Sequence, residues 1–327
     1  MLSMYEKFGE FVAGKNKICV IQAENPDGDS LGSAVALDYL LNDKDVSLYC
    51  PVDIPKYLRY FDDWSRVTNE FDFQADGYII VDTAAKVLLS KLLDDAAIRN
   101  RLYNAPVLVI DHHETEDDLD FAHDSIIELR PACTELIYEL ATKNKMEIPQ
   151  PAAEALMQGI MSDTLGLTST SVTARTFEIC AELTRLGANN SELEEKRREF
   201  MKKSPRILDY KADLIKRVEY SLDGALATVH ITWDDIQQFS DEYNPNVLIL
   251  EELRLVEGVK IAVAVKTYPD GKITGKIRCS GSDTGIADKI AGYFGGGGHP
   301  FAAGFRTYDM SYEEVVRDLV RIIPEML

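Results

Sequence analysis

Three short apolar segments of this sequence each run directly into acidic residues. Segments of this kind, followed by turn-forming residues, are typical of buried strands in a parallel sheet. In such a sheet the strand ends gather at one edge, where ligands bind. The pattern therefore predicts a shared site built from the residues that follow the three strands. The segments are 17–22 before Asp27 and Asp29, 77–81 before Asp82, and 106–110 before Asp111, His112 and His113.

Such a concentration of carboxylates predicts a metal site. Several unpaired carboxylates in one small site repel one another and raise each other's pKa, and divalent cations remove that penalty. Asp163 extends the set, because it ends a segment of small and apolar residues. Asp27 or Asp82 alone would be explained equally well as a helix cap or a turn residue. Two histidines directly after Asp111 are harder to explain without a ligand.

Size and charge limit the classes of protein that fit. The chain has 327 residues, 46% of them hydrophobic, which is enough for two ordinary domains. Its formal charge of −20 argues against long duplex DNA, whose binding requires many phosphates to be neutralised. The five scattered cysteines include no C-x-x-C pair and indicate free thiols in a reducing compartment. No segment resembles a signal peptide or a membrane span, so we expect a cytoplasmic protein that does not contact membranes.

The order of predicted elements indicates two domains. Residues 1–187 alternate strands with helices, including helices at 31–41, 134–142, 151–161 and 174–186, which predicts an α/β, doubly wound and mostly parallel sheet. Residues 188–218 are densely charged and predict a helical connector. Residues 219–327 predict a smaller α+β domain with antiparallel strands at 225–231, 259–268 and 272–279, and helices at 286–294 and 312–323.

The motifs together resemble those of the DHH/DHHA1 phosphoesterase family. They are the Asn-Pro-Asp-Gly-Asp turn at 25–29, Val-Asp-Thr at 81–83, Asp-His-His at 111–113, Ser-Asp-Thr at 162–164 and the glycine-rich stretch at 295–304. They follow the family's order over nearly the whole chain. Without further domains, the architecture is most similar to the nanoRNase/pAp-phosphatase (NrnA-like) type. The resemblance implies a DHH catalytic domain with two Mn²⁺ ions, Mg²⁺ being the alternative, and a DHHA1 domain that grips substrate.

Carried over to this sequence, the resemblance implies a role for each motif residue. Asp82 would bridge both ions, and Asp27 would bind the first. Asp29, His112 and Asp163 would bind the second ion. His113 would act near the scissile phosphate, and Asp111 would orient the histidines. In the second domain the implied substrate-binding residues are Arg278, Ser280, Gly296, Gly297, Gly298 and His299.

One position departs from the family pattern. The family has a histidine three residues before the proline of the first motif, where this chain has Ala23. We expect weaker occupancy of the first metal site, with water replacing the lost ligand. Glu24 could compensate only if the end of the strand frays, because successive strand residues point to opposite faces. A catalytically weakened, nucleotide-binding protein is therefore an alternative to an active enzyme.

Two features have competing interpretations. The four glycines at 295–298 could form a flexible joint, or a backbone that approaches an anion closely; the resemblance favours the anion. The basic residues at 196–206 are interleaved with glutamates, which favours a solvated helix face over a role near a substrate cleft between the two predicted domains.

The resulting expectation is a phosphoesterase that hydrolyses short RNA or DNA oligonucleotides, linear dinucleotides or pAp to mononucleotides by in-line attack of water between two metals. The alternatives are a single-strand exonuclease, a cyclic-dinucleotide phosphodiesterase or the weakened binding protein. The resemblance also raises a homodimer, for which the sequence itself supplies no argument.

Overall fold

The computed structural model describes residues 3–113, 117–281, 284–308 and 310–326. The chain divides into two units, 1–202 and 203–327. The division falls inside the segment 188–218, which we expected to be a helical connector and which contains two helices, α8 (Asn190–Phe200) and α9 (Pro205–Lys216).

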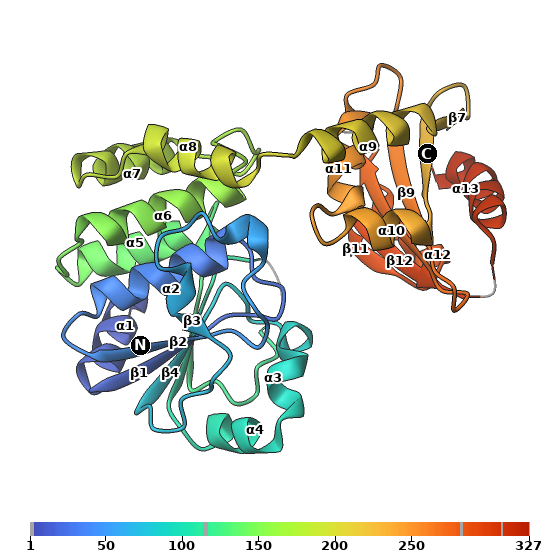
Figure 1. Cartoon of the computed structure of the whole chain (residues 1–327). Coiled ribbons are helices and arrows are strands. Elements are labelled where there is room, and N and C mark those ends of the chain that lie inside the picture. The colour runs from blue at the N-terminus through green and yellow to red at the C-terminus, as the bar shows by residue number, and fades with distance from the viewer. Residues whose placement is uncertain (1–2, 114–116, 282–283, 309, 327) are drawn as a thin grey trace. The chain divides into compact units, whose positions relative to one another are not determined.

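The first unit is built on a six-stranded parallel sheet (Figure 1). Its strand order is β3-β2-β1-β4-β5-β6, and every neighbouring pair is parallel. From β1 the chain adds strands toward one edge of the sheet, as far as β3, and then toward the other edge, from β4 to β6. In doubly wound folds, ligands bind where the order switches in this way, here between β1 and β4. The strands are β1 (Lys17–Ile21), β2 (Asp45–Tyr49), β3 (Val67–Thr68), β4 (Gly77–Val81), β5 (Val107–Asp111) and β6 (Asp124–Ile127).

Helices cover both faces of this sheet (Figure 1). Alternate residues of β1 contribute to two separate apolar cores: Ile18 and Val20 to the core beneath α2, α5 and α6, and Cys19 and Ile21 to the core beneath α3 and α4. Burial on both faces explains why the strand sequences are continuously apolar. The remaining elements of the unit are α1 (Met4–Ala13), α2 (Gly28–Leu40), η1 (Lys56–Leu58), η2 (Trp64–Arg66), η3 (Lys86–Leu89), α3 (Ser90–Asp94), α4 (Ala96–Tyr103), α5 (Cys133–Lys143), α6 (Gln150–Asp163) and α7 (Ala174–Arg185).

Two glycines allow α2 and α6 to cross closely. A Cβ atom at Gly32 would lie 2.7 Å from the carbonyl oxygen of Ala155 and 3.2 Å from Cα of Gly159, and one at Gly159 would lie 3.0 Å from Oδ1 of Asp29. Larger residues would push these helices apart. The close crossing holds the first turn of α2, which carries Asp29, near the last turn of α6, which carries Asp163.

The second unit contains a mixed sheet in the order β11-β12-β10-β9-β8-β7. Its core on one face lies beneath α12 and α13, and the opposite core lies beneath α9 and α11. The strands are β7 (Glu219–Ser221), β8 (Leu226–Ile231), β9 (Ile261–Thr267), β10 (Ile273–Cys279), β11 (Gly297–His299) and β12 (Ala302–Thr307). The helices, besides α9, are α10 (Trp233–Phe239), α11 (Pro245–Arg254), α12 (Ala287–Tyr293) and α13 (Tyr312–Met326).

One strand pairing in this unit was predicted wrongly. We expected antiparallel strands throughout, but β8 pairs with β9 in parallel. The reason is the connection between them, which carries α10 and α11 and is long enough to return the chain to the end of the sheet where β8 began. The expected antiparallel pairing of β9 with β10 is confirmed.

All five cysteines are buried and none forms a disulfide. In the part of the chain that the structure describes, no helix combines the length and the apolar character that crossing a bilayer requires.

Candidate metal centre

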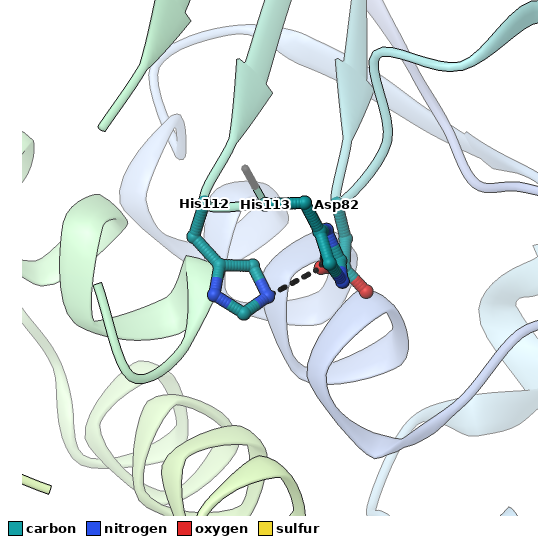
Figure 2. A group of neighbouring side chains, drawn as sticks. All are labelled: Asp82, His112 and His113. Carbon is teal, nitrogen blue, oxygen red and sulfur yellow. Dashed lines mark ion pairs between the residues drawn. The ribbon is translucent and has the colours of Figure 1, made fainter. Parts of the chain in front are cut away.

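Three of the predicted acidic residues of the first unit converge on the imidazole of His112. Its Nε2 atom lies 3.3 Å from Oδ1 of Asp82, 3.5 Å from Oδ2 of Asp163 and 3.7 Å from Oδ2 of Asp29. Asp82 and His112 follow neighbouring parallel strands, so the sheet itself brings them together, and Figure 2 shows them with His113. Within the part of the chain that the structure describes, two groups of side chains could each hold a metal ion: Asp82 with His112 and His113, and Asp29 with His112 and Asp163.

His112 is oriented as a metal ligand would be. Its Nδ1 atom lies 2.8 Å from the carbonyl oxygen of Arg130, which can only accept a hydrogen bond, so Nδ1 carries the proton. The lone pair is therefore on Nε2, which faces the carboxylates. This second hydrogen bond is the usual means by which proteins fix a ligand imidazole.

Several polar atoms of the centre are buried without a partner. Among the described residues, Nε2 of His112, Oδ1 of Asp82 and Oδ2 of Asp111 form no hydrogen bond. Buried polar atoms are nearly always paired, and unpaired ones are costly. A divalent cation would satisfy the first two together, so the donor set fits a metal ion.

The electrostatics agree with this fit. Burial raises the pKa of Asp29, and burial together with the charges of Asp29 and Asp27 raises that of Asp82 well above its usual range. Burial, followed by the charge of Asp29, raises the pKa of Asp163 to about 7. Without a cation these carboxylates resist ionisation, and a bound cation would reverse that preference.

Local structure explains how two of the carboxylates are held. Asp29 accepts hydrogen bonds from the backbone of Cys133 (2.5 Å) and Thr134 (3.0 Å), and from the Thr134 hydroxyl (2.6 Å), at the first turn of α5. Asp82 has a φ of +62°, a left-handed conformation that is unfavourable for a non-glycine residue. Strain of this kind is concentrated at functional sites, where it aims a side chain.

Asp27 occupies a different position from the other carboxylates. It is exposed, and its Oδ1 atom caps α2 by accepting hydrogen bonds from the backbone of Asp29 (3.0 Å) and Ser30 (2.9 Å). Within the described residues it belongs to neither candidate metal group, although its negative charge acts on Asp29, Asp82 and Asp163. Its role as ligand of a first ion stays a prediction.

Ala23 and Glu24 lie at the position where the expected imidazole is missing. Ala23 is buried and offers no side-chain ligand. The Glu24 carboxylate accepts hydrogen bonds from the Ser90 hydroxyl (2.9 Å) and the Lys91 backbone (2.7 Å), at the start of α3. Glu24 is therefore engaged at a helix terminus and does not replace the imidazole in this conformation.

His113 and Asp111 form a pair beside the centre. The Nδ1 atom of His113 lies 2.7 Å from Oδ1 of Asp111, which also accepts from the backbone of both histidines. The hydrogen bond with Asp111 raises the pKa of His113. Burial alone would raise the pKa of Asp111, but its bonds with His113 lower it instead. His113 is exposed, so a protonatable imidazole faces the solvent side of the centre.

The predicted substrate-binding residues lie in the second unit. Arg278 on β10 and His299 on β11 are both paired with Ala302 of the strand between them, β12. Paired residues project from the same face of a sheet, so Arg278 and His299 lie on either side of the small Ala302 side chain, with their backbones about 10 Å apart. Arg278 lies 3.9 Å from Glu251, and the Ser280 hydroxyl donates to the Arg254 carbonyl.

The glycine run is partly explained by strand packing. A Cβ atom at Gly296 would lie 2.2 Å from the carbonyl oxygen of Gly304, and one at Gly298, whose φ is +144°, would lie 2.7 Å from that of Ala302. These two glycines are required for β11 to approach β12. Gly297 differs, because a Cβ atom there would meet nothing within 4 Å.

Comparison with known proteins agrees with the fold and with the motifs. Residues 17–160, which include four of the five predicted metal ligands, match the DHH family, N-terminal domain. The first unit therefore contains a DHH-family domain, which confirms this part of the resemblance recognised in the sequence.

Individual relatives extend the similarity over the chain. This chain is 26% identical over 302 residues to the bifunctional oligoribonuclease and PAP phosphatase NrnA of Thermus thermophilus, and the match covers 89% of this chain and 86% of that protein. It is 27% identical over 189 residues to a probable manganese-dependent inorganic pyrophosphatase of Streptococcus agalactiae, covering 54% and 58%. The crystal structure of an exopolyphosphatase-related protein from Bacteroides fragilis superposes with a TM-score of 0.85 at 20% identity, covering 98% of this chain and 95% of that one.

Proposed function

We propose that this protein is a metal-dependent phosphoesterase that hydrolyses short oligonucleotides, linear dinucleotides or pAp to mononucleotides. The observation that carries the proposal is the buried, unpaired Nε2 atom of His112, which faces three carboxylates while Nδ1 is held by the Arg130 carbonyl. The DHH-family match and the NrnA relative support phosphate esters of nucleotides as the substrate class.

The metal would be held by Asp82, His112, Asp29 and Asp163, with Mn²⁺ as the proposed ion and Mg²⁺ as the alternative. The pyrophosphatase relative, whose name includes manganese dependence, supports this choice. Divalent ions bound here would lower the pKa of water and neutralise charge on a phosphate.

The residues of the chain have separate tasks in the proposed reaction. Asp82, Asp29 and Asp163 supply the negative charge that would attract and position the ions. His113, with its proton-binding Nδ1 held by Asp111, is placed to donate a proton to the leaving oxygen through its other nitrogen. Arg278 and His299 are proposed to bind substrate phosphate, for which a guanidinium is well suited.

Turnover assays test the proposal directly. The protein is incubated with pApA or pAp over a range of Mn²⁺ concentrations, and AMP is measured. We expect AMP release that depends on Mn²⁺ and is abolished in Asp82→Ala. Nucleotide binding without AMP release at any Mn²⁺ concentration would instead support the second candidate, a catalytically weakened nucleotide-binding protein, which the buried Ala23 and the engaged Glu24 favour.

A reducing, cytoplasmic location is also proposed. Its support is that all five cysteines are buried and unbonded, as is usual in proteins kept reduced.

A further inference from the structure

A cavity of about 630 Å³ opens beside the candidate metal centre, within the first unit. Its lining includes Asp27 and Ser162, which lie within two residues in sequence of the candidate ligands Asp29 and Asp163. Its volume is in the range of sites that bind small molecules. A ligand seated in it could therefore reach the centre from within one unit of the chain.

The walls of this cavity are suited to a flat aromatic group. They include Tyr57, Leu58 and Tyr60, from the segment after β2, together with Met161 and Leu193. Tyr57 is 54% exposed and Tyr60 is 9% exposed, so the ring of Tyr57 is available for stacking. Aromatic side chains of this kind stack with nucleobases of any sequence.

Gln158 adds a hydrogen-bond donor that lacks an acceptor. Gln158 is one of the residues that line the cavity, it is only 6% exposed, and its Nε2 atom has no partner among the described residues. A buried amide donor without a partner is unfavourable. An acceptor atom on a bound ligand, such as a ring nitrogen or carbonyl oxygen of a base, would satisfy it.

The charges around the cavity favour a neutral occupant. Arg197 and Arg198 of α8 line it, but both are paired with Glu194, which also lines it, at 2.7 and 2.8 Å. With Asp27, the lining carries two cations and two carboxylates. A phosphate would find no net positive charge here, whereas an uncharged base needs none. Of the basic residues at 196–206, Arg197 and Arg198 therefore lie at the cavity, while Lys196 pairs with Asp62.

We propose that this cavity holds the nucleobase of the nucleotide whose ester is hydrolysed, stacked on Tyr57 and accepting a hydrogen bond from Gln158. This proposal rests on the proposed phosphoesterase function and specifies its substrate: esters that carry a base should be preferred over the same esters without one.

Adenosine binding tests the proposal separately from catalysis. Calorimetric titration of the full chain with adenosine, in the absence of metal, is compared among wild type, Tyr57→Ala and Tyr220→Ala. Tyr220 is the matched control, because it is 53% exposed but lies on β7 of the second unit. We expect Tyr57→Ala to weaken adenosine binding about tenfold or more, as loss of a stacking partner does, and Tyr220→Ala to leave it unchanged. Equal affinity in wild type and Tyr57→Ala would overturn the proposal.

A second variant separates binding from folding. Gln158→Leu removes the unpaired donor while keeping a side chain of similar size. We expect weaker adenosine binding, because the donor is lost. We expect no lower Tm, because the buried amide nitrogen that is removed has no hydrogen-bond partner in the free protein. A lower Tm with unchanged adenosine affinity would mean that Gln158 has a structural role only, and would remove it from the site.

Kinetics distinguish failure of this proposal from failure of the proposed function. In Tyr57→Ala we expect KM for pApA to rise about tenfold, with no change for an analogue of pApA that lacks both bases. An equal rise for both substrates would contradict a base site. If the wild type hydrolyses neither substrate at any Mn²⁺ concentration, the proposed function fails, and adenosine binding alone decides whether the cavity binds a base.

Discussion

The Nε2 atom of His112 lies 3.3 Å from Oδ1 of Asp82, and neither atom has a hydrogen-bond partner among the described residues. Because the other imidazole nitrogen is committed to the Arg130 carbonyl, both facing atoms are acceptors. Two buried acceptors repel each other unless a cation or a proton lies between them. The pair therefore links metal binding, protonation and stability.

Without metal, the protein should become more stable as the pH is lowered from 7 to 5. Asp163 has a pKa of about 7 in the folded state, raised by burial and by Asp29, against about 3.9 in an unfolded chain. Between these values the folded state binds more protons, so the free energy of unfolding falls as pH rises. Asp163→Asn should reduce the difference between the free energies of unfolding at pH 5 and pH 7 by on the order of 1–3 kcal/mol. Denaturant unfolding in EDTA measures both values.

The matched control is Asp209→Asn, at an exposed position on α9 of the second unit. It should retain the pH dependence of the wild type. Mn²⁺ should raise the Tm of the wild type more at pH 7.5 than at pH 5.5, since protons and cations compete for the same carboxylates. A metal-free Asp163→Asn protein with the full wild-type dependence would contradict the assignment of Asp163 to the centre.

Asp111 should set the pH range of activity through His113. Its hydrogen bond raises the pKa of His113, so the imidazolium persists to higher pH. In Asp111→Asn the pKa of His113 should fall, and the loss of kcat at high pH should begin at a lower pH. His113→Gln should lower kcat by roughly 10²–10⁴-fold. A kcat profile whose alkaline limb is identical in wild type and Asp111→Asn would count against His113 as the proton donor.

Sequence reasoning succeeded where a local pattern determines a placement. The apolar strands at 77–81 and 106–110 had to be central in a parallel sheet, so the residues after them, Asp82 and His112, had to meet at one edge. Asp163 could be added because it ends a segment of small and apolar residues, and its motif also matches the family. Its approach to Asp29 depends on the crossing of two helices at Gly32 and Gly159, which no local pattern specifies.

Features that depend on distant contacts were not predicted. The parallel pairing of β8 with β9 is decided by the path of a long connection. Glu24 could be excluded as a ligand only once Ser90 and Lys91 were seen to hold it. The cavity is lined both by residues 57–60 and by α8, which are about 130 residues apart in the sequence, and the aromatic residues Tyr57 and Tyr60 were the only local signal of it.

Ala23→His should lower the Mn²⁺ concentration needed for half-maximal activity, because it supplies an imidazole at the position where the family pattern has one. The fold change should be about 10–100 if the new side chain becomes a ligand. Glu24→Gln is the control: it weakens a hydrogen-bond acceptor at the start of α3 and should lower stability without changing the Mn²⁺ requirement. An unchanged Mn²⁺ requirement in Ala23→His would contradict the interpretation that a metal ligand is missing at position 23.

Two adjacent glycines allow the packing and anion-binding interpretations of the glycine run to be separated. A methyl group at Gly296 would lie 2.2 Å from the carbonyl oxygen of Gly304 and 2.6 Å from Cα of Phe305, and backbone atoms in a sheet cannot move aside cheaply. Gly296→Ala should therefore destabilise the second unit by about 1–3 kcal/mol. Gly297→Ala, with open space around it, should change stability by less than about 0.5 kcal/mol.

The informative measurement is nucleotide affinity in the stable variant. If the backbone at Gly297 approaches a substrate phosphate, Gly297→Ala should weaken pAp binding while its Tm stays at the wild-type value, because the added methyl group would occupy the space that the anion needs. If pAp affinity is also unchanged, the glycines serve the pairing of β11 with β12, and the phosphate contacts of the second unit reduce to side chains such as Arg278 and His299. Calorimetric titration of both alanine variants, with Tm measured on the same samples, decides between these outcomes.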